Sequence, residues 1–264
     1  MIWFAVMFAV AMVISAVGFK KYVYFISLGY GFSVAGIAIA SLIAFHEDLT
    51  AGTVVICVLM SLYGVRLAGY LLLRELRSAS YRKAMKNNIK DGKNMSMVAK
   101  VSIWVTCALL YACQTSPVYF RLAVNEDVNA ALWIGIVIMF LGVAIESTAD
   151  IQKNIAKKKD PNTFVRTGLF KIVRCPNYFG EMVFWTGVLI SGIGAFDSVV
   201  FWIISILGYL GIIYVMFSGA RRLELRQNKN YGEDPEYQKY VKTTPIMVPL
   251  IPLYSVESQK WLVG

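Results

Sequence analysis

Long apolar stretches constrain this chain more than any other feature of its sequence. A membrane-spanning helix needs about 20 mostly apolar residues to cross roughly 30 Å of hydrocarbon. Seven stretches approach that length: 2–18, 22–45, 51–73, 98–119, 129–148, 179–196 and 198–219. Charged residues make up 16% of the chain, against roughly 25% in a soluble domain. We therefore predict an all-α integral membrane protein, with residues 1–264 forming a single transmembrane domain of about seven helices.

The net charge of +10 falls on alternate loops between these stretches. Basic residues dominate 20–21, 74–100, 149–178 and 220–264, whereas acidic residues dominate 46–48, 126–127 and position 197. Because positively charged loops stay in the cytoplasm, this alternation predicts an N-terminus outside and a C-terminus in the cytosol. The first 18 residues lack a basic region and a cleavage site, so we expect a retained helix.

The basic excess is spread over loops beside the membrane, so we expect lipid head groups and an anionic cofactor as partners, and no nucleic acid. Residues 149–264 should carry most of the cytosolic cofactor-binding elements. The chain has four cysteines, no C-x-x-C motif and the single histidine His46, so we expect free thiols and no Cys/His metal site. We further expect a monomer in a bacterial inner membrane or a membrane like the endoplasmic reticulum, with its active-site mouth facing the cytosol.

Three charged residues, Arg66, Glu146 and Glu181, lie within or at the ends of the apolar stretches. A charge in the bilayer costs at least about 2.5–3.5 kcal/mol, so each needs a partner, water or a ligand. Tyr63 and Arg66 share one helix face at a spacing of i and i+3. The structural alternative for this pair is an interfacial tyrosine beside an arginine that extends to the head groups.

Two further groups combine carboxylates with amines or amides. Glu146, Asp150 and Lys157 follow one another towards the cytosolic end of their helix, an order that suits a ribose hydroxyl followed by phosphates. The alternative is a solvated helix end. In the run 167–181, Pro176 marks a helix start, and the helix begins with the polar residues Asn177, Tyr178 and Glu181, preceded by Arg174. Helix capping explains only part of this run.

The tail after position 220 contains Tyr231, Tyr237 and Tyr240, followed by the prolines at 245, 249 and 252. Prolines at this density disfavour helix. We therefore expect a non-helical segment lying across the cytosolic mouth, or alternatively an aromatic anchor at the membrane interface.

Together these stretches resemble the steroid 5α-reductase family, and specifically its bacterial members, over roughly residues 55–255. The resemblance rests on the following positions: Tyr63 with Arg66, Asp150, Gly168-Leu169-Phe170, Arg174, Pro176-Asn177-Tyr178, Gly180-Glu181, Leu223-Glu224, Tyr237, Tyr240 and Pro249. The motif around 168–181 is the most specific of these.

The resemblance implies a seven-helix reductase that uses NADPH to reduce a carbon–carbon double bond conjugated to a ketone. The substrate would be a Δ4-3-oxosteroid or a similar lipophilic enone that enters from the membrane. Tyr63 would polarise the ketone, with Tyr30 as a second catalytic candidate. The cofactor-binding candidates are Arg66, Arg77, Glu146, Asp150, Lys157, Arg166, Arg174, Asn177, Tyr178, Glu181 and Tyr240. No G-x-G-x-x-G motif follows a strand, so a Rossmann site is not expected.

The sequence departs from the family pattern at two places. The second apolar stretch lacks the Gln-Glu pair that contacts the catalytic tyrosine in steroid reductases, and Tyr30 or Ser27 are the residues available to replace it. Cys175 stands where bacterial relatives often have histidine. Two other interpretations stay open: a methyltransferase similar to the isoprenylcysteine carboxyl methyltransferases, which would use S-adenosylmethionine, and a non-enzymatic lipid-binding protein.

Overall fold

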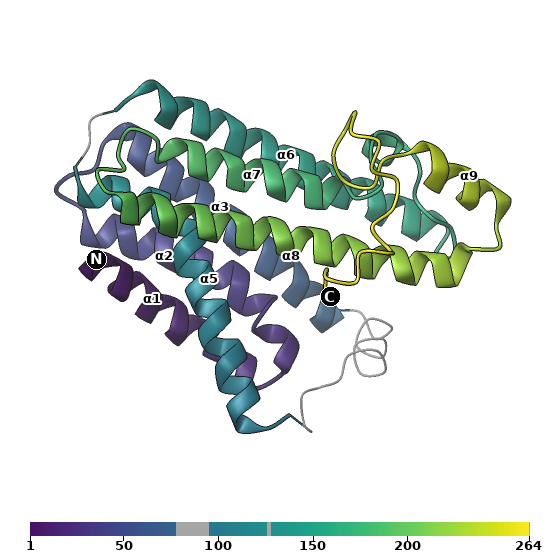
Figure 1. Cartoon of the computed structure of the whole chain (residues 1–264), viewed down its shortest axis with the longest axis horizontal. Helices are drawn as coiled ribbons and strands as arrows, with labels where there is room; N and C mark the ends of the chain where they lie inside the picture. Colours follow the sequence, from purple (N-terminus) through teal and green to yellow (C-terminus); the bar gives the residue numbers. More distant parts are fainter. Residues whose placement is uncertain (78–94, 126–127, 264) are drawn as a thin grey trace. The chain divides into compact units, whose positions relative to one another are not determined.

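The computed structural model describes residues 1–77, 95–125 and 128–263, apart from the side chains of Arg74 and Arg77. Over these residues every regular element is a helix (Figure 1). The α-helices are α1 (Ile2–Ser15), α2 (Leu28–Ala44), α3 (Ala51–Arg77), α5 (Met97–Ala123), α6 (Ala130–Lys159), α7 (Pro176–Ser191), α8 (Val199–Tyr231) and α9 (Pro235–Thr243). Three short 3-10 helices, η1 (Ala16–Phe19), η2 (Tyr22–Tyr24) and η3 (Gly168–Lys171), lie between them.

The described residues include six helical segments that are long and apolar enough to cross a membrane. These are Ile2–Phe19, Tyr22–Ala44, Ala51–Leu73, Met97–Ala123, Ala130–Lys159 and Val199–Tyr231. The chain is thus an all-α, multi-pass membrane protein, as its apolar stretches predict. The other predicted crossing, 179–196, corresponds to α7, whose 16 residues extend about 24 Å at 1.5 Å per residue. It is shorter than those six segments.

The tail is more helical than its prolines predict. α8 continues to Tyr231, because residues 221–230 are rich in Arg, Leu, Glu, Gln and Lys, which favour helix. α9 then begins after Asp234, whose carboxylate accepts a hydrogen bond from the Glu236 amide at 2.8 Å, with Pro235 at its first position. The expectation of a non-helical tail is therefore wrong before Thr244 and is confirmed after it.

The chain divides into two compact units. The first comprises Met1–Ile136 and Val188–Tyr209, and the second comprises Val137–Gly187 and Leu210–Gly264. Helices α6, α7 and α8 each contribute residues to both units.

In the first unit, α2 and α3 approach each other closely because each has a glycine at the contact. A Cβ atom built on Gly31 would lie 2.6 Å from the Gly64 carbonyl oxygen, and one on Gly64 would lie 2.3 Å from the Gly31 carbonyl oxygen. Any larger residue would push the two backbones apart. The same contact therefore fixes the residues that precede these glycines, Tyr30 and Tyr63.

The outer end of the first unit is held by a buried arginine. Arg121 is 1% exposed at the end of α5, and its guanidinium donates hydrogen bonds to the carbonyls of Ser191 and Ile193 and to the side chain of Asn129. This charge therefore lies among backbone acceptors in the turn between α7 and α8, where it has a structural task.

In the second unit, a pair of glycines likewise brings α6 and α7 together. A Cβ atom on Gly142 would lie 2.5 Å from the Phe184 amide nitrogen, and one on Gly180 would lie 2.7 Å from the Glu146 amide nitrogen. Beyond this crossing, η3 folds back on α6: Ala149, Val165 and Phe170 form a small buried cluster. The crossing positions the acidic residues of α6 and α7.

Candidate functional site

Two tyrosine side chains meet in the interior of the first unit. Tyr63 of α3 is fully buried and Tyr30 of α2 is 6% exposed. Their hydroxyl oxygens are 2.9 Å apart, so one donates a hydrogen bond to the other. Where the sequence lacks the Gln-Glu pair of the family, the structure therefore pairs Tyr63 with a second phenol from the same helix, α2.

Aromatic packing holds this tyrosine pair in place. The Tyr111 ring of α5 lies 5.3 Å from the Tyr30 ring, and the Tyr111 hydroxyl donates to the Phe25 carbonyl at 2.6 Å. Arg66 is partly buried one turn after Tyr63 on α3. The first unit thus combines a phenol that can donate a hydrogen bond with a cation on the same helix.

The second unit contains two buried carboxylates beside the crossing of α6 and α7. Glu146 is 3% exposed on α6, and Glu181 is 5% exposed on α7. Each follows a glycine of the crossing on its own helix, Gly142 by one turn and Gly180 directly. Both the burial and the shared position agree with the expectation that these acids do more than solvate helix ends.

The other polar candidates of this region are partly exposed. Asp150 lies one turn after Glu146 on α6, and Asn177 and Tyr178 occupy the first turn of α7. The Tyr178 ring packs over α8, where a Cβ atom on Gly219 would lie 3.3 Å from its hydroxyl oxygen. Amide, phenol and carboxylate groups are thus accessible at the start of α7.

Two basic candidates already contact protein groups. The ammonium of Lys157 donates to the carbonyls of Pro161 and Thr163 and to the Tyr231 hydroxyl. Arg166 is exposed and forms an ion pair with Glu236 at 2.6 Å. A surface pair of this kind contributes only about 0–1 kcal/mol. Arg166 could therefore change partners at little cost, whereas Lys157 holds together the loop after α6.

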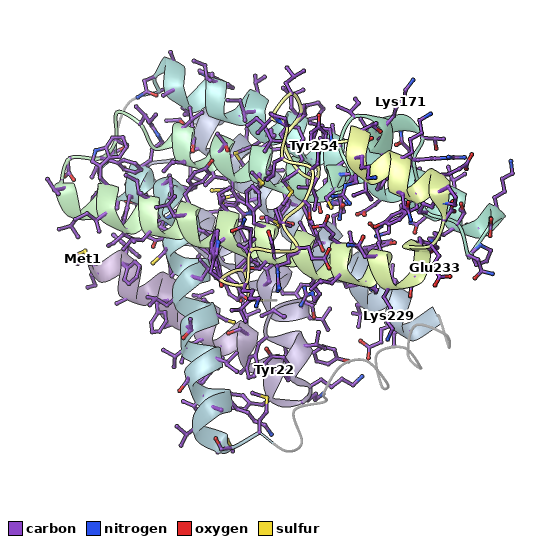
Figure 2. All side chains as sticks on the ribbon, turned by 45° about the vertical axis from the view of Figure 1, so that its right-hand side comes forward. Met1, Tyr22, Lys171, Lys229, Glu233 and Tyr254 are labelled. Atoms are coloured by element: carbon purple, nitrogen blue, oxygen red, sulfur yellow. The ribbon has the colours of Figure 1, made fainter. Side chains whose placement is uncertain are left out.

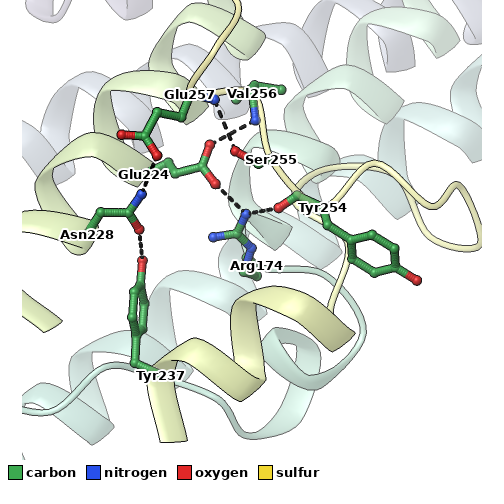
Figure 3. A network of polar contacts seen from close by, with 8 residues as sticks. All are labelled: Arg174, Glu224, Asn228, Tyr237, Tyr254, Ser255, Val256 and Glu257. Carbon is green, nitrogen blue, oxygen red and sulfur yellow. Dashed lines mark hydrogen bonds and ion pairs between the residues drawn. The ribbon is translucent and has the colours of Figure 1, made fainter. Parts of the chain in front are cut away.

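Arg174 forms a buried ion pair (Figure 3). Its guanidinium is 2.7 Å from a Glu224 carboxylate oxygen, and both side chains are 1% exposed. It also donates to the Tyr254 carbonyl. Removing one partner from a buried pair costs about 3–5 kcal/mol. This cost favours a structural task for Arg174 over phosphate binding.

The last two candidates are Tyr240 and Arg77. Tyr240 of α9 donates its hydroxyl hydrogen to the Phe170 carbonyl at 2.6 Å, and its ring stacks on Phe164 at 5.6 Å. This contact ties α9 to the motif that begins at Gly168. The Arg77 side chain lies outside the described residues.

Sequence reasoning did not place Glu224 in the site, although it noticed the Leu223-Glu224 pair. A glutamate in a helix that is otherwise apolar up to Ser218 could have marked a buried partner for one of the basic residues. Gln152 was also missed: its side-chain carbonyl accepts a hydrogen bond from the Leu169 amide at 2.9 Å and so ties η3 to α6. Neither interaction has a local sequence signal, since the partners are 50 and 17 residues apart.

The candidate residues therefore fall into two groups. Tyr30, Tyr63 and Arg66 belong to the first unit. The remaining described candidates belong to the second: Glu146, Asp150, Lys157, Arg166, Arg174, Asn177, Tyr178, Glu181 and Tyr240.

Comparison with known proteins identifies two curated relatives. The chain is 38% identical to steroid 5-alpha-reductase DET2 of Arabidopsis thaliana over 81 residues, which are 27% of this chain and 31% of the relative. It is 22% identical to 3-oxo-5-alpha-steroid 4-dehydrogenase 1 of Rattus norvegicus over 167 residues, covering 62% of this chain and 59% of the relative. The matches thus span less than two thirds of either relative. No solved structure matches the chain.

The profile of one protein family matches residues 10–244. That range includes every candidate residue on α2, α3, α6, α7 and α9. The similarity to steroid 5α-reductases agrees with the resemblance seen in the motifs. The chain belongs to the family described as "Protein of unknown function (DUF1295)".

Proposed function

We propose that this protein is a membrane-embedded reductase that uses NADPH to saturate a carbon–carbon double bond conjugated to a ketone. Its substrate would be a lipophilic enone such as a Δ4-3-oxosteroid. The observation that carries the proposal is the buried hydrogen bond between the Tyr63 and Tyr30 hydroxyls. The names of the two relatives, a steroid 5-alpha-reductase and a 3-oxo-5-alpha-steroid 4-dehydrogenase, support the substrate class.

In this mechanism Tyr63 donates its hydroxyl hydrogen to the substrate ketone. A phenol with a pKa near 10 is a weak acid, so a donor of this kind works best in a buried, preorganised setting. Tyr30 supports that setting, because its own hydroxyl can donate to the Tyr63 oxygen while Tyr63 donates to the ketone. The nearby charge of Arg66 would stabilise negative charge that develops on the phenol oxygen.

The polar groups of the second unit fit a dinucleotide in kind. The buried carboxylates of Glu146 and Glu181 are acceptors that suit a carboxamide or ribose hydroxyls. Asn177 and Tyr178 add a carboxamide and a phenol at the start of α7. Arg166 is the cation that can most easily exchange its surface contact for a phosphate. When bound, NADPH supplies the hydride that the β-carbon of the enone receives.

The interpretation of Arg174, Lys157 and Tyr240 changes with their contacts. We propose that these three residues position the binding elements: Arg174 through Glu224, Lys157 through the loop at 161–163, and Tyr240 through the Phe170 carbonyl. Their substitution would then alter nucleotide affinity indirectly, through the positions of α7 and η3.

The proposal is tested by titrating the detergent-purified protein with NADPH, and separately with S-adenosylmethionine, while recording thermal stability. A ligand that binds only the folded state raises the midpoint of unfolding. We expect NADPH to do so, and we expect NADPH oxidation when a Δ4-3-oxosteroid is added. Stabilisation by S-adenosylmethionine alone would instead support a methyltransferase. A response to neither ligand would favour a non-enzymatic lipid-binding protein.

Glu181→Gln provides the site-specific arm of this titration. The change keeps the size of the side chain and removes the carboxylate, so the dissociation constant for NADPH should rise about tenfold, in line with about 1.5–3 kcal/mol for hydrogen bonds to charged groups. Glu233→Gln is the matched control, because Glu233 is an exposed acid in the turn between α8 and α9. Equal affinity of wild type and Glu181→Gln would remove Glu181 from the nucleotide site.

A further inference from the structure

The last residues of the chain, 245–263, form a segment that we call the strap. It follows α9, lies outside the residues matched by the family profile, and contains no helix. Its first residues pair with the segment before α7: the amides of Arg174 and Cys175 donate to the carbonyls of Pro245 and Ile246 at 2.8 and 2.9 Å. The strap therefore begins where α7 begins.

Side chains of α7's leading segment and of α8 hold the middle of the strap. Arg174 binds the Tyr254 carbonyl, and the second carboxylate oxygen of Glu224 accepts the Val256 amide at 2.9 Å (Figure 3). Further along α8, the Asn228 amide donates to the Glu257 carboxylate at 2.8 Å. The strap is thus fixed by a buried ion pair, and its conformation is part of the fold.

Between these anchors the strap projects an apolar tip. Leu250 is 99% exposed and Ile251 is 52% exposed, with prolines on both sides. The base of the tip is closed by a hydrogen bond from the Ile246 amide to the Leu253 carbonyl at 2.8 Å. Exposure of a leucine to water forgoes about 1.5–3 kcal/mol. The fold therefore presents this side chain to its surroundings instead of burying it in the protein.

The Leu250 backbone makes the exposure more costly. Its φ angle is +66°, in the left-handed region that costs a residue with a Cβ atom roughly 1–2 kcal/mol. A glycine or asparagine would tolerate the same turn more easily. A leucine that is both strained and exposed is understandable if an apolar environment covers it.

The end of the strap indicates what that environment is. The Tyr214 hydroxyl of α8 donates to the Trp261 carbonyl at 3.0 Å and accepts from the Val263 amide at 3.2 Å. Tyr214 lies in the apolar part of α8, about two turns before its first charged residue, Arg221. The Trp261 side chain is 64% exposed. Both ends of the strap therefore lie where a helix of the second unit changes from polar to apolar surroundings.

We propose that the strap rests on the bilayer surface, with Leu250 and Ile251 inserted among the lipids and Trp261 at the level of the head groups. Tryptophan and tyrosine favour this interface, and interfacial segments bury their apolar side chains about 5–10 Å into it. The tip is too small to support a stable contact with a second copy, which requires roughly 1,200 Å² of buried surface or more. Lipid therefore covers the tip.

The test attaches an environment-sensitive fluorophore to Leu250→Cys in nanodiscs of phosphatidylcholine and phosphatidylglycerol. Quenching is measured with brominated acyl chains and, separately, with aqueous iodide. Glu233→Cys is the control, because Glu233 follows α8 about 18 Å beyond Arg221 at 1.5 Å per residue and is exposed. The wild-type chain, taken through the same labelling, corrects for its four native cysteines. Ile251→Cys provides a second position if labelling at 250 disturbs the fold.

We expect the labels at 250 and 251 to be quenched by brominated lipid and protected from iodide, with the opposite pattern at 233. Quenching by iodide at all three positions would place the tip in water and overturn the proposal. Protection from both quenchers, with self-quenching that increases with protein concentration, would also overturn it, because a second copy would then cover the tip. These outcomes do not depend on the proposed reaction.

Discussion

At the scale of single residues, Tyr63 has a structure-defined partner that can be tested by removing one hydroxyl at a time. Tyr63→Phe deletes the proposed donor and leaves the ring in place. We expect turnover of the enone to fall about 10²–10⁴-fold, the usual contribution of a positioned acid, while the NADPH-dependent rise in thermal stability persists. The measurement is NADPH oxidation under saturating cofactor.

Two further variants separate chemistry from packing. Tyr30→Phe removes the supporting hydroxyl and should give a smaller loss of turnover than Tyr63→Phe. Tyr119→Phe is the control, since Tyr119 is a buried tyrosine on α5 whose hydroxyl bonds only to the Ala112 carbonyl among the contacts of the described residues. If Tyr119→Phe reduced turnover as much as Tyr63→Phe, the loss would reflect general destabilisation.

Cys175 shows how burial controls reactivity beside the motif. Burial raises the pKa of its thiol from 9.0 to about 12, and burial likewise raises the pKa of Tyr237 to about 12. Because the folded state disfavours both anions, the stability is fully present below pH 9 and falls as the pH rises from 9 towards 12. We expect the midpoint of thermal unfolding to decline over that range.

The same burial predicts that Cys175 resists alkylation at pH 8 in the folded protein and reacts after denaturation, because the thiolate is the reactive form. Mass spectrometry of the peptide that contains Cys175 measures this directly. Rapid modification in the native state would contradict the burial of this thiol.

At the scale of elements, glycine contacts decide which helix faces meet. Gly64→Ala adds a Cβ atom that would lie 2.3 Å from the Gly31 carbonyl oxygen. We expect a loss of about 1–3 kcal/mol in the free energy of unfolding, as for other overpacked sites, together with weaker activity as Tyr30 and Tyr63 separate. Thermal unfolding and NADPH oxidation measure the two effects.

Gly69→Ala is the matched control on the same helix. A Cβ atom at Gly69 would have no atom within 4 Å among the contacts of the described residues, and alanine favours helix over glycine by about 1 kcal/mol. We therefore expect Gly69→Ala to keep or raise stability. Equal effects at both positions would show that the Gly31–Gly64 contact is not what limits this helix pair.

Helix ends were less predictable than helix cores. Apolar runs located all seven of the predicted helices, because hydrocarbon requires an internally hydrogen-bonded backbone. The cytosolic continuation of α8 to Tyr231 and the existence of α9 were missed, because helix formers and an aspartate cap act there without an apolar signal. Figure 2 shows this polar region, with Lys171, Lys229 and Glu233 labelled.

At the scale of the whole molecule, the number of crossings determines the orientation of the termini. We propose that α7 crosses the membrane as the seventh helix, so that the N-terminus lies outside and the C-terminus in the cytosol. A fluorescent protein fused after residue 264 should then be bright, and an alkaline phosphatase fusion there inactive. The control is a phosphatase fusion after Glu47, in the loop between α2 and α3, which should be active.

A C-terminal phosphatase that was active, with Glu47 fusions also active, would contradict this topology. The two sites would then lie on the same face, as expected if α7 did not cross. The short length of α7 makes it the helix whose crossing needs this test.

The sequence by itself determined the helical membrane architecture, the family resemblance and the candidate residues around 168–181. Each of these follows from local composition or spacing, which a linear pattern records. Only the tertiary structure decided that Tyr30 bonds Tyr63, that Arg174 is neutralised by Glu224, and that the strap projects Leu250. Those contacts join residues 33 and 50 positions apart in the first two cases, and they depend on glycine-mediated helix approach and on burial. No local pattern encodes either of these, because both arise only when distant segments pack.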